Sequence, residues 1–428
     1  MPRGLTMTAP PSRIEADYLI ETPGDPGRVA DAIAGEQSSG TFVPVPGETP
    51  ELKARAAAVV ECLAVLDEDV AAPSLPSAGM PTRPGMPIRR ALITLSWPLE
   101  NLGPSLPNLL ATVAGNLFEL KPVTGLKLLD LRMPSAFAEA YPGPRFGIEG
   151  TRRLTGIESR PLIGTIVKPS VGFGPDETAA LVATLCEGGI DFIKDDELQS
   201  DGPSCPFEAR VRAVMQVVRA HADRTGRKVM YAFNLTGDLD QMRRRHDLLL
   251  SEEATCLMAS LNSVGLVGMI ELSRFSELPI HGHRNGWGSM SRHPLLGWSY
   301  VAWQKIWRLA GADHMHVNGL ANKFAEPDES VIASAQTCLT PLFPDKPCLA
   351  MPVFSSGQTA KQASGTYEAL RSTDLIVTAG GGIMAHPDGP AAGVAAMRHA
   401  WDAAVAGIPL ADYARKHFEL ERALDAVG

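Results

Sequence analysis

The sequence predicts an α/β protein in which a TIM (β/α)8 barrel follows an N-terminal α+β domain of ferredoxin-like type. From Leu162 onward, short apolar segments alternate with helical segments, and eight such pairs are the pattern of a closed parallel barrel. The unusual polar residues of this part stand directly after the apolar segments. Barrel enzymes carry their catalytic groups at these strand ends, so the polar residues independently support the same fold.

The eight expected barrel strands are short apolar runs, and a helical segment such as Trp298–Ala310 or Ala391–Ala406 follows each of them. The strands are expected at Leu162–Val167, Ile190–Lys194, Val229–Leu235, Cys256–Leu261, Pro279–His283, His314–Val317, Cys348–Phe354 and Leu375–Thr378.

The preceding part of the chain lacks this alternation and predicts the α+β domain. We expect residues 1–13 to be a flexible N-terminus, 14–150 to form this domain and 151–428 to form the barrel. A Pro/Gly-dense loop is expected at Pro73–Pro87 and a connector at Tyr141–Gly150. The expected strands are Glu15–Glu21, Ile88–Trp97 and Leu126–Met133, and the expected helices are Asp25–Ala34, the Ala-rich Leu52–Leu66, and Ser105–Asn116.

Charge and composition exclude several classes of protein. A net charge of −9 argues against a nucleic-acid or anionic-membrane surface, and an anionic substrate would need a local cluster of positive groups. The six cysteines have no metal-binding spacing, and several lie in apolar runs, which predicts reduced core thiols. No apolar run is long enough to span a membrane, and Met1–Pro11 lacks a signal-peptide core, so we expect a cytoplasmic protein.

The segment Gly189–Glu197 carries the strongest chemical signal. A short buried strand ends in Lys194 and then in Asp196 and Glu197, with Asp195 pointing to the other side of the strand. Carboxylate oxygens at the mouth of a barrel suit a hard cation such as Mg²⁺. The alternative is a lysine that neutralises surplus acid on a solvated turn, and the segment alone does not decide between the two.

Other strand ends carry further candidates, although each alone is compatible with an ordinary turn. His281 and His283 alternate with Gly282, so both are expected to face the barrel interior. Glycines after the last two strands can admit backbone N–H groups to a phosphate. The candidates at these ends are Lys168, Ser170, His283, Arg284, His316, Lys323, Ser355, Gly357, Gly380 and Gly381.

Together these motifs resemble the RuBisCO large-subunit superfamily over roughly residues 14 to 406. The resemblance implies that Lys194 takes up CO₂ as a carbamate, which then holds Mg²⁺ together with Asp196 and Glu197. Only a neutral amine attacks CO₂, whereas flanking carboxylates favour the ammonium form, so activation is expected to need CO₂ and Mg²⁺ together.

The resemblance also implies roles for the remaining candidates. Lys168 would move protons, His283 would act near the metal, and Lys323 on a mobile lid would face a substrate carboxylate. Phosphate ligands would be Arg284 and His316 on one side and Ser355, Gly357, Gly380 and Gly381 on the other. Glu36, Thr41 and Asn116 would complete the site of a partner subunit, so a homodimer or an assembly of dimers is expected.

One departure points to the RuBisCO-like branch, because Ser170 stands where carboxylases have a second lysine. Trp287 stands where they have a histidine, so we expect a reshaped and drier pocket. The sequence therefore favours an Mg²⁺-dependent enzyme that works through an enediolate, with decarboxylation or C–C cleavage of a substrate like 3-oxo-isoapionate 4-phosphate preferred. The alternatives are an enolase or isomerase of methylthio-sugar phosphates in methionine salvage, ribulose-bisphosphate carboxylation, and a catalytically dead binding protein.

Overall fold

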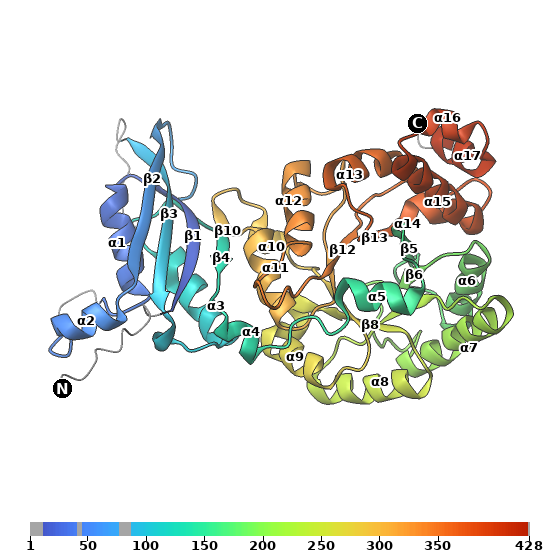
Figure 1. Cartoon of the computed structure of the whole chain (residues 1–428), viewed down its shortest axis with the longest axis horizontal. Coiled ribbons are helices and arrows are strands. Elements are labelled where there is room, and N and C mark those ends of the chain that lie inside the picture. Colours follow the sequence, from blue (N-terminus) through green and yellow to red (C-terminus); the bar gives the residue numbers. More distant parts are fainter. Residues whose placement is uncertain (1–11, 41–44, 77–86, 427–428) are drawn as a thin grey trace, which may run out of the picture. The chain divides into compact units, whose positions relative to one another are not determined.

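The computed structural model describes residues 12–40, 45–76 and 87–426, and it divides the chain into two compact units (Figure 1). The first unit contains the described residues up to Tyr141 together with Gly288–Ile306. The second contains Pro142–Trp287 and the described residues from Trp307 onward. The predicted N-terminus at residues 1–13 lies almost entirely outside the described residues, and the predicted domain boundary at residue 150 stays a prediction.

A five-stranded sheet with the order β10-β4-β1-β3-β2 forms the centre of the first unit. The central strand β1 is antiparallel to both β3 and β4, and β10 is parallel to β4. Alternate residues of β1 are buried, which leaves one face of this strand on the core. The strands are β1 (Arg13–Thr22), β2 (Val59–Val70), β3 (Ile88–Pro98), β4 (Gly125–Arg132) and β10 (Leu296–Trp298).

Capping residues begin the main helices of this unit. The side chains of Asp25, Thr49 and Ser105 each accept a backbone N–H at the start of α1, α2 and α3. The Tyr18 hydroxyl donates to the Val113 carbonyl at 2.7 Å and so ties α3 to the sheet. The helices are α1 (Pro26–Glu36), α2 (Pro50–Ala56), α3 (Leu106–Ala114), α4 (Ala136–Ala140), α10 (Gly288–Ser291), and the 3₁₀ helices Leu99–Asn101 and Asn116–Glu119.

The helix predicted at Leu52–Leu66 is wrong beyond its first turns. Helix α2 ends at Ala56, and strand β2 begins at Val59. The valines of this strand favour extended backbone, and pairing with β3 satisfies its backbone N–H and C=O groups. Together these two effects outweigh the helix preference of the alanines. Val59, Leu63 and Val65 are exposed on this edge strand, so the alternation that would have identified it is missing.

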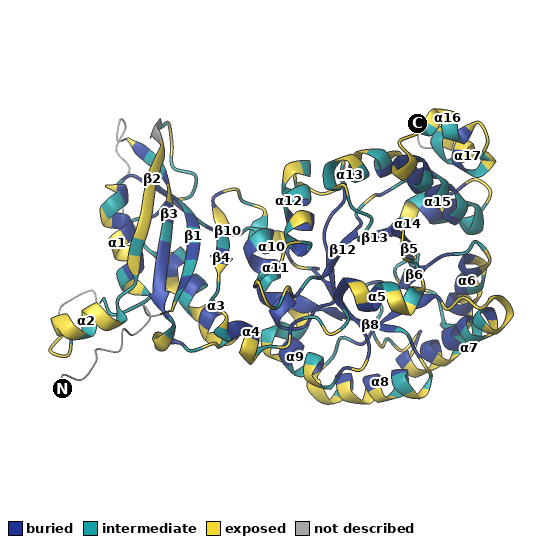
Figure 2. Cartoon of the chain, viewed as in Figure 1, coloured by how far each residue is buried: buried dark blue, intermediate teal, exposed yellow. Residues whose placement is uncertain are grey.

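The second unit is the predicted TIM barrel. Eight parallel strands close in the order β11-β12-β13-β5-β6-β7-β8-β9, which confirms all eight expected strands to within a few residues. Figure 2 shows these strands buried inside the ring of helices. The strands are β5 (Leu162–Ile166), β6 (Phe192–Lys194), β7 (Met230–Asn234), β8 (Cys256–Ser260), β9 (Ile280–His283), β11 (His314–His316), β12 (Met351–Phe354) and β13 (Ile376–Thr378).

Helices follow the barrel strands as expected, and α5 (Gly147–Thr155) precedes the first of them. Helix α11 (Tyr300–Leu309) begins in the first unit and ends in the second. The others are α6 (Pro175–Glu187), α7 (Phe207–Thr225), α8 (Leu239–Ser251), α9 (Leu261–Phe275), α12 (Asp328–Cys338), the 3₁₀ helix Ala360–Gln362, α13 (Ala363–Leu370), α14 (Gly380–Met384), α15 (Pro390–Ala406), α16 (Leu410–Ala414) and α17 (Phe418–Ala426).

The barrel interior is filled by apolar side chains of its own strands, including Leu162, Phe192, Met258 and Val353. The predicted reduced thiols are confirmed, since all six cysteines are unpaired and all except Cys62 are buried. Among the described residues, no helix is long and apolar enough to cross a membrane.

A buried carboxylate joins two strands to the start of a helix in the barrel. Asp313, directly before β11, accepts the backbone N–H groups of Phe146 and Gly147 at 2.6 and 2.8 Å, where α5 begins. Its other oxygen accepts the N–H of Ile280 at 2.8 Å, at the start of β9. Burial raises the pKa of this carboxyl to about 6, although these three hydrogen bonds oppose the rise.

Replacing Asp313 should therefore destabilise the barrel. In Asp313→Asn one oxygen becomes an NH₂ group that faces a backbone N–H, so a buried donor loses its acceptor. The free energy of unfolding should fall by roughly 1–3 kcal/mol. Urea unfolding followed by far-UV circular dichroism measures this change. Asp223→Asn, an exposed acid on α7, is the matched control, and equal stability of the two variants would contradict the prediction.

Candidate active site at the barrel mouth

The predicted polar residues of the barrel gather at one end because all eight strands are parallel. Lys168 follows β5, Lys194 closes β6 and Glu197 lies three residues beyond it. His283 closes β9 and His316 closes β11. Ser355 comes directly after β12, and Gly380 lies two residues after the end of β13.

Lys194 is fully buried, and its Nζ donates to the Asp195 carbonyl at 2.8 Å. Burial lowers the pKa of its ammonium to about 8, even though Glu197, Asp196 and Asp195 act to raise it. The acids favour the ammonium form, as expected, but loss of hydration outweighs their attraction and lowers the pKa. Roughly a tenth of such amines are neutral at pH 7, and only the neutral form is nucleophilic.

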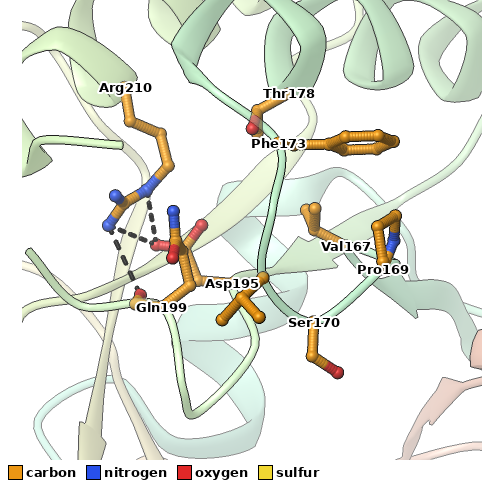
Figure 3. A pocket seen from close by; sticks show the side chains of 9 residues that line it. Val167, Pro169, Ser170, Phe173, Thr178, Asp195, Gln199 and Arg210 are labelled. Carbon is orange, nitrogen blue, oxygen red and sulfur yellow. Dashed lines mark hydrogen bonds and ion pairs between the residues drawn. The ribbon is translucent and has the colours of Figure 1, made fainter. Parts of the chain in front are cut away.

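Asp195 points away from this lysine, as the alternation along β6 predicts. Its carboxylate accepts from the Tyr231 hydroxyl at 2.6 Å and from the Asn234 N–H at 2.8 Å, and it pairs with the fully buried Arg210 at 3.1 Å. Figure 3 shows the Arg210 guanidinium directed at Asp195, with Ser170 at the other end of the same small pocket. Asp195 therefore fixes the end of β6 from behind and is not available to a ligand.

Asp196 faces the mouth and is held by Lys168, the residue predicted to transfer protons. Lys168 Nζ donates to its Oδ2 at 2.6 Å and to Ser170 Oγ at 2.7 Å. Burial acts to raise the pKa of Asp196, but the hydrogen bonds from Lys168 and the Leu198 N–H keep it below its ordinary value. Ser170, the residue that departs from the carboxylase pattern, thus positions Lys168 on a candidate metal ligand.

Glu197 lies beside His283, with 3.6 Å between its Oε2 and the histidine Nε2. Burial lowers the pKa of His283 to about 3, so the ring is neutral near pH 7. Nδ1 of His283 is held by Asn285, whose N–H lies at 3.2 Å and whose Oδ1 lies at 3.1 Å. Nε2 faces the Glu197 carboxylate.

Asn234, at the end of β7, is a site residue that sequence reasoning missed. Its Nδ2 donates to the backbone carbonyls of Asp196 and Glu197 at 3.3 and 3.2 Å, while its Oδ1 accepts from the Thr236 hydroxyl at 2.7 Å. It therefore holds the backbone that presents both acids. Its place at the end of a barrel strand was the only signal that could have found it.

Four histidines line the inside of the barrel below and beside these groups. His283 and His316 have ring centres 4.4 Å apart, and His281 lies 5.6 Å from His316 and 5.8 Å from His314. Burial lowers the pKa of His314 to about 3 and that of His281 and His316 well below the ordinary value. The predicted inward direction of His281 and His283 is consistent with these contacts, and the rings add no positive charge near pH 7.

Arg284, a predicted phosphate ligand, pairs with an acid that the sequence did not indicate. Its Nη2 donates to Glu326 Oε2 at 2.8 Å, and both side chains are mostly buried. Glu326 belongs to the segment that also carries Lys323. The guanidinium that the sequence predicts to bind phosphate is therefore paired with a carboxylate of the same chain.

Lys323 lies on the same side of the barrel as the loop after β12. Its backbone N–H donates to the Ser356 carbonyl at 3.2 Å, whereas its side chain is exposed with Nζ 5.3 Å from the centre of the Phe324 ring. Gln358 Nε2 donates to the Leu320 carbonyl at 3.2 Å, and a Cβ at Gly319 would come within 2.0 Å of Gln358. Backbone groups of Leu320 and Lys323 therefore bond to the loop after β12. The Lys323 ammonium does not contact Asp196 or Glu197.

The glycines after the last two strands leave room at the mouth. Gly357 has a φ of 91°, which favours glycine, and a Cβ at Gly381 would meet nothing within 4 Å. A Cβ at Gly380 would lie 3.9 Å from the Lys168 side chain. Ser355 Oγ donates to the Val317 carbonyl at 3.0 Å, which joins this edge to β11.

The remaining predicted residues belong to the first unit. Glu36 ends α1 and Asn116 opens a 3₁₀ helix, and both are exposed. The Gln37 amide contacts the Asn116 segment, because its oxygen accepts the Asn116 N–H at 2.9 Å and its nitrogen donates to the Ala111 carbonyl at 3.2 Å. Thr41 lies outside the described residues.

The acids at the mouth fit a metal only with a further ligand. Among the described residues, no group of three or more His, Cys, Asp and Glu side chains is arranged to hold a metal ion. Asp196 and Glu197 supply two carboxylates, and the buried amine of Lys194 has the lowered pKa that reaction with CO₂ requires. A carbamate on Lys194 would complete an oxygen-ligand set of the kind Mg²⁺ prefers.

Comparison with known proteins gives matches over nearly the whole chain. The model of the ribulose bisphosphate carboxylase large chain, catalytic domain, matches residues 147–427, and that of its N-terminal domain matches residues 85–137. A 3-oxo-isoapionate-4-phosphate transcarboxylase/hydrolase of Xanthobacter autotrophicus is 59% identical over 413 residues, 96% of this chain and 98% of that protein. A 3-oxo-isoapionate-4-phosphate decarboxylase of Rhizobium rhizogenes is 47% identical, with 95% and 96% covered.

A solved structure agrees with these matches. The crystal structure of a rubisco-like protein from Burkholderia fungorum superposes with a TM-score of 0.90 at 52% sequence identity. The superposition covers 97% of this chain and 99% of that one.

The role of Asn234 predicts a loss of metal affinity. In Asn234→Ala the backbone of Asp196 and Glu197 loses both amide contacts, so the two carboxylates are less well fixed. Affinity for Mn²⁺, used as a spectroscopic substitute for Mg²⁺, should fall roughly 10- to 100-fold. Electron paramagnetic resonance titration in bicarbonate buffer measures it. Asn101→Ala, which removes an exposed amide in the first unit, is the control, and unchanged affinity in Asn234→Ala would refute the role.

Proposed function

This chain belongs to the ribulose bisphosphate carboxylase large-chain family, in its RuBisCO-like branch, and we propose that it decarboxylates or cleaves a substrate like 3-oxo-isoapionate 4-phosphate. The observation that carries the proposal is the buried, low-pKa Lys194 beside Asp196 and Glu197. It stands in a chain that is 47–59% identical over its full length to enzymes named for that substrate.

The chemistry of a 3-oxo acid suits this site. Its carboxylate stands β to a ketone, so when CO₂ leaves, the electron pair of the broken C–C bond moves onto the ketone oxygen as an enolate. An adjacent hydroxyl makes this species an enediolate. The enzyme's task is to stabilise the charge on that oxygen and to deliver or remove protons next to it.

The residues around Lys194 would hold the metal needed for this task. Mg²⁺, when bound, would stabilise the negative charge that develops on the substrate oxygens. Asp196 and Glu197 would be its protein ligands, with the Lys194 carbamate as the third. Asn234 would fix the backbone of the two acids, and Asp195 would fix the end of β6 from behind.

Two residues are placed to move protons. Lys168 Nζ is shared between Asp196 and Ser170, and its side chain is 40% exposed, so it can reach a substrate at the mouth. His283 is neutral near pH 7, and its Nε2 lies 3.6 Å from Glu197 Oε2, where it would exchange a proton with the substrate. We assign Lys168 and His283 to proton transfer at the enediolate.

Other residues would bind the ends of the substrate. Backbone N–H groups at Gly380 and Gly381, with Ser355 and Gly357 beside them, would take the phosphate. Lys323 would approach the carboxylate when its segment closes over the substrate. His316 would lie on the opposite side of the mouth, next to His283.

The active form would be a homodimer or an assembly of dimers. Glu36, Thr41 and Asn116 belong to the N-terminal part of the chain, outside the barrel that carries the metal ligands. We propose that they complete the site of the partner subunit, as the family resemblance implies.

A labelled substrate tests the proposed function. The purified chain with Mg²⁺ and bicarbonate should consume 3-oxo-isoapionate 4-phosphate that carries ¹³C in its carboxylate. Release of the label as CO₂ identifies a decarboxylase, and retention in a new acid identifies a transcarboxylase/hydrolase; ¹³C and ³¹P NMR separate the two. Glu197→Gln should abolish consumption, whereas Glu329→Gln, an exposed acid on α12, should not. An unchanged substrate in the presence of metal would refute the proposal.

The lowered pKa of Lys194 predicts how carbamate formation depends on pH. Because the neutral amine attacks CO₂, the rate of carbamate formation at constant dissolved CO₂ should rise with pH and level off above about 8. The carbamate ¹³C resonance of protein in labelled bicarbonate measures it without turnover. Lys194→Ala should lose the signal and Lys323→Ala should keep it. A rise centred near 10.5, the ordinary lysine pKa, would contradict the assignment.

A further inference from the structure

The pairing of Arg284 with Glu326 has a consequence for the substrate. Arg284 follows β9 at the mouth and is 8% exposed as a residue. Its Nη2 donates to Glu326 Oε2 at 2.8 Å, and the Glu326 side chain is 15% exposed. A guanidinium at such a place is suited to a phosphate, but here a carboxylate of the same chain takes one of its donors.

Glu326 is fixed in this position by further hydrogen bonds. Asn318 Nδ2 donates to the same Oε2 at 2.6 Å, and Ser330 Oγ donates to Oε1 at 2.9 Å. The Ser356 hydroxyl donates to Asn318 Oδ1 at 2.8 Å and so orients the Asn318 amide. Asn322 Nδ2 donates to the Glu326 backbone carbonyl at 3.1 Å. Both carboxylate oxygens are therefore satisfied by groups of the protein.

A phosphate at Arg284 would meet this carboxylate. Two anions would then share one cation in a poorly hydrated place, which is repulsive. Moving Glu326 aside would break three hydrogen bonds to its carboxylate, two of them from neutral donors that would need new partners. On the opposite side of the mouth, a Cβ at Gly381 would meet nothing within 4 Å, and Gly357 has a φ of 91°.

We propose that Glu326 determines specificity by occupying the position of a second phosphate at Arg284, so that the site takes a substrate with one phosphate. This inference rests on the proposed function, because it concerns the same site and refines its substrate class. Arg284 then serves to neutralise and hold Glu326. A bisphosphate is disfavoured by charge.

Glu326→Gln tests this with little structural change. The glutamine oxygen can keep the bonds from Arg284 and Asn318, and its NH₂ can donate to Ser330 Oγ, which also accepts. Only the charge is lost. The ligands are ribulose 1,5-bisphosphate and ribulose 5-phosphate, which differ by a single phosphate. Their dissociation constants are measured by calorimetry without added metal, so that the result does not depend on turnover.

The unmodified chain should bind the two ligands with similar affinity. Glu326→Gln should bind the bisphosphate about tenfold more tightly and leave the monophosphate unchanged, because the repulsion is removed. Glu329→Gln, which removes the same charge from an exposed position on α12, should change neither. Adding Arg284→Gln to Glu326→Gln should abolish the gain.

Two results would overturn the proposal. If the unmodified chain already binds the bisphosphate at least tenfold more tightly than the monophosphate, Glu326 moves aside for a phosphate and does not exclude it. If Glu326→Gln leaves the ratio of the two affinities unchanged, the carboxylate does not act on the ligand. Either result can be obtained whether or not the chain consumes 3-oxo-isoapionate 4-phosphate, so the two proposals fail separately.

Discussion

Burial of the Lys194 ammonium is the constraint around which the barrel mouth is arranged. A charge without water at the end of β6 is unfavourable, and three nearby carboxylates offset only part of that cost. Hydrogen bonds and ion pairs from neighbouring residues hold these three acids in two different directions. Asp195 is turned to Arg210 and Tyr231, whereas Asp196 and Glu197 stay at the mouth under the control of Lys168, His283 and Asn234. The result is an amine that can lose its proton at moderate pH.

The barrel and the segment Gly189–Glu197 could be predicted from the sequence because each barrel strand is recognisable from its own residues. A parallel barrel strand is buried on both faces and appears as a continuous apolar run, so strands such as Cys256–Ser260 were recognisable. The fold then places whatever follows each run at the same mouth. For this reason the sequence alone is enough to group Lys194, Asp196 and His283 in one site.

The features that escaped prediction depend on partners distant in the sequence. Strand β2 is identified by its pairing with β3, since its exposed Leu63 and Val65 give no alternating pattern. Asn234 acts on a backbone carbonyl 38 residues away, and a lone asparagine carries no motif. Glu326 is 42 residues from Arg284, and nothing in the intervening sequence indicates that the two side chains meet. The pKa of Lys194 also required the structure, because its acids were visible in the sequence and its burial was not.

The five-stranded sheet cannot be made from consecutive residues, and this limits how the chain can be recombined. Strand β10 pairs with β4 in parallel, with Leu296 beside Leu126, and Lys305 Nζ contacts Asp130 at 2.5 Å. A fragment that stops at Tyr141 would leave the free edge of β4 without its partner, and such an edge invites pairing with other chains. A chimaera that exchanges the N-terminal part between relatives would therefore have to carry residues 288–306 with it. Each unit is compact, yet the residues of the two units alternate along the chain.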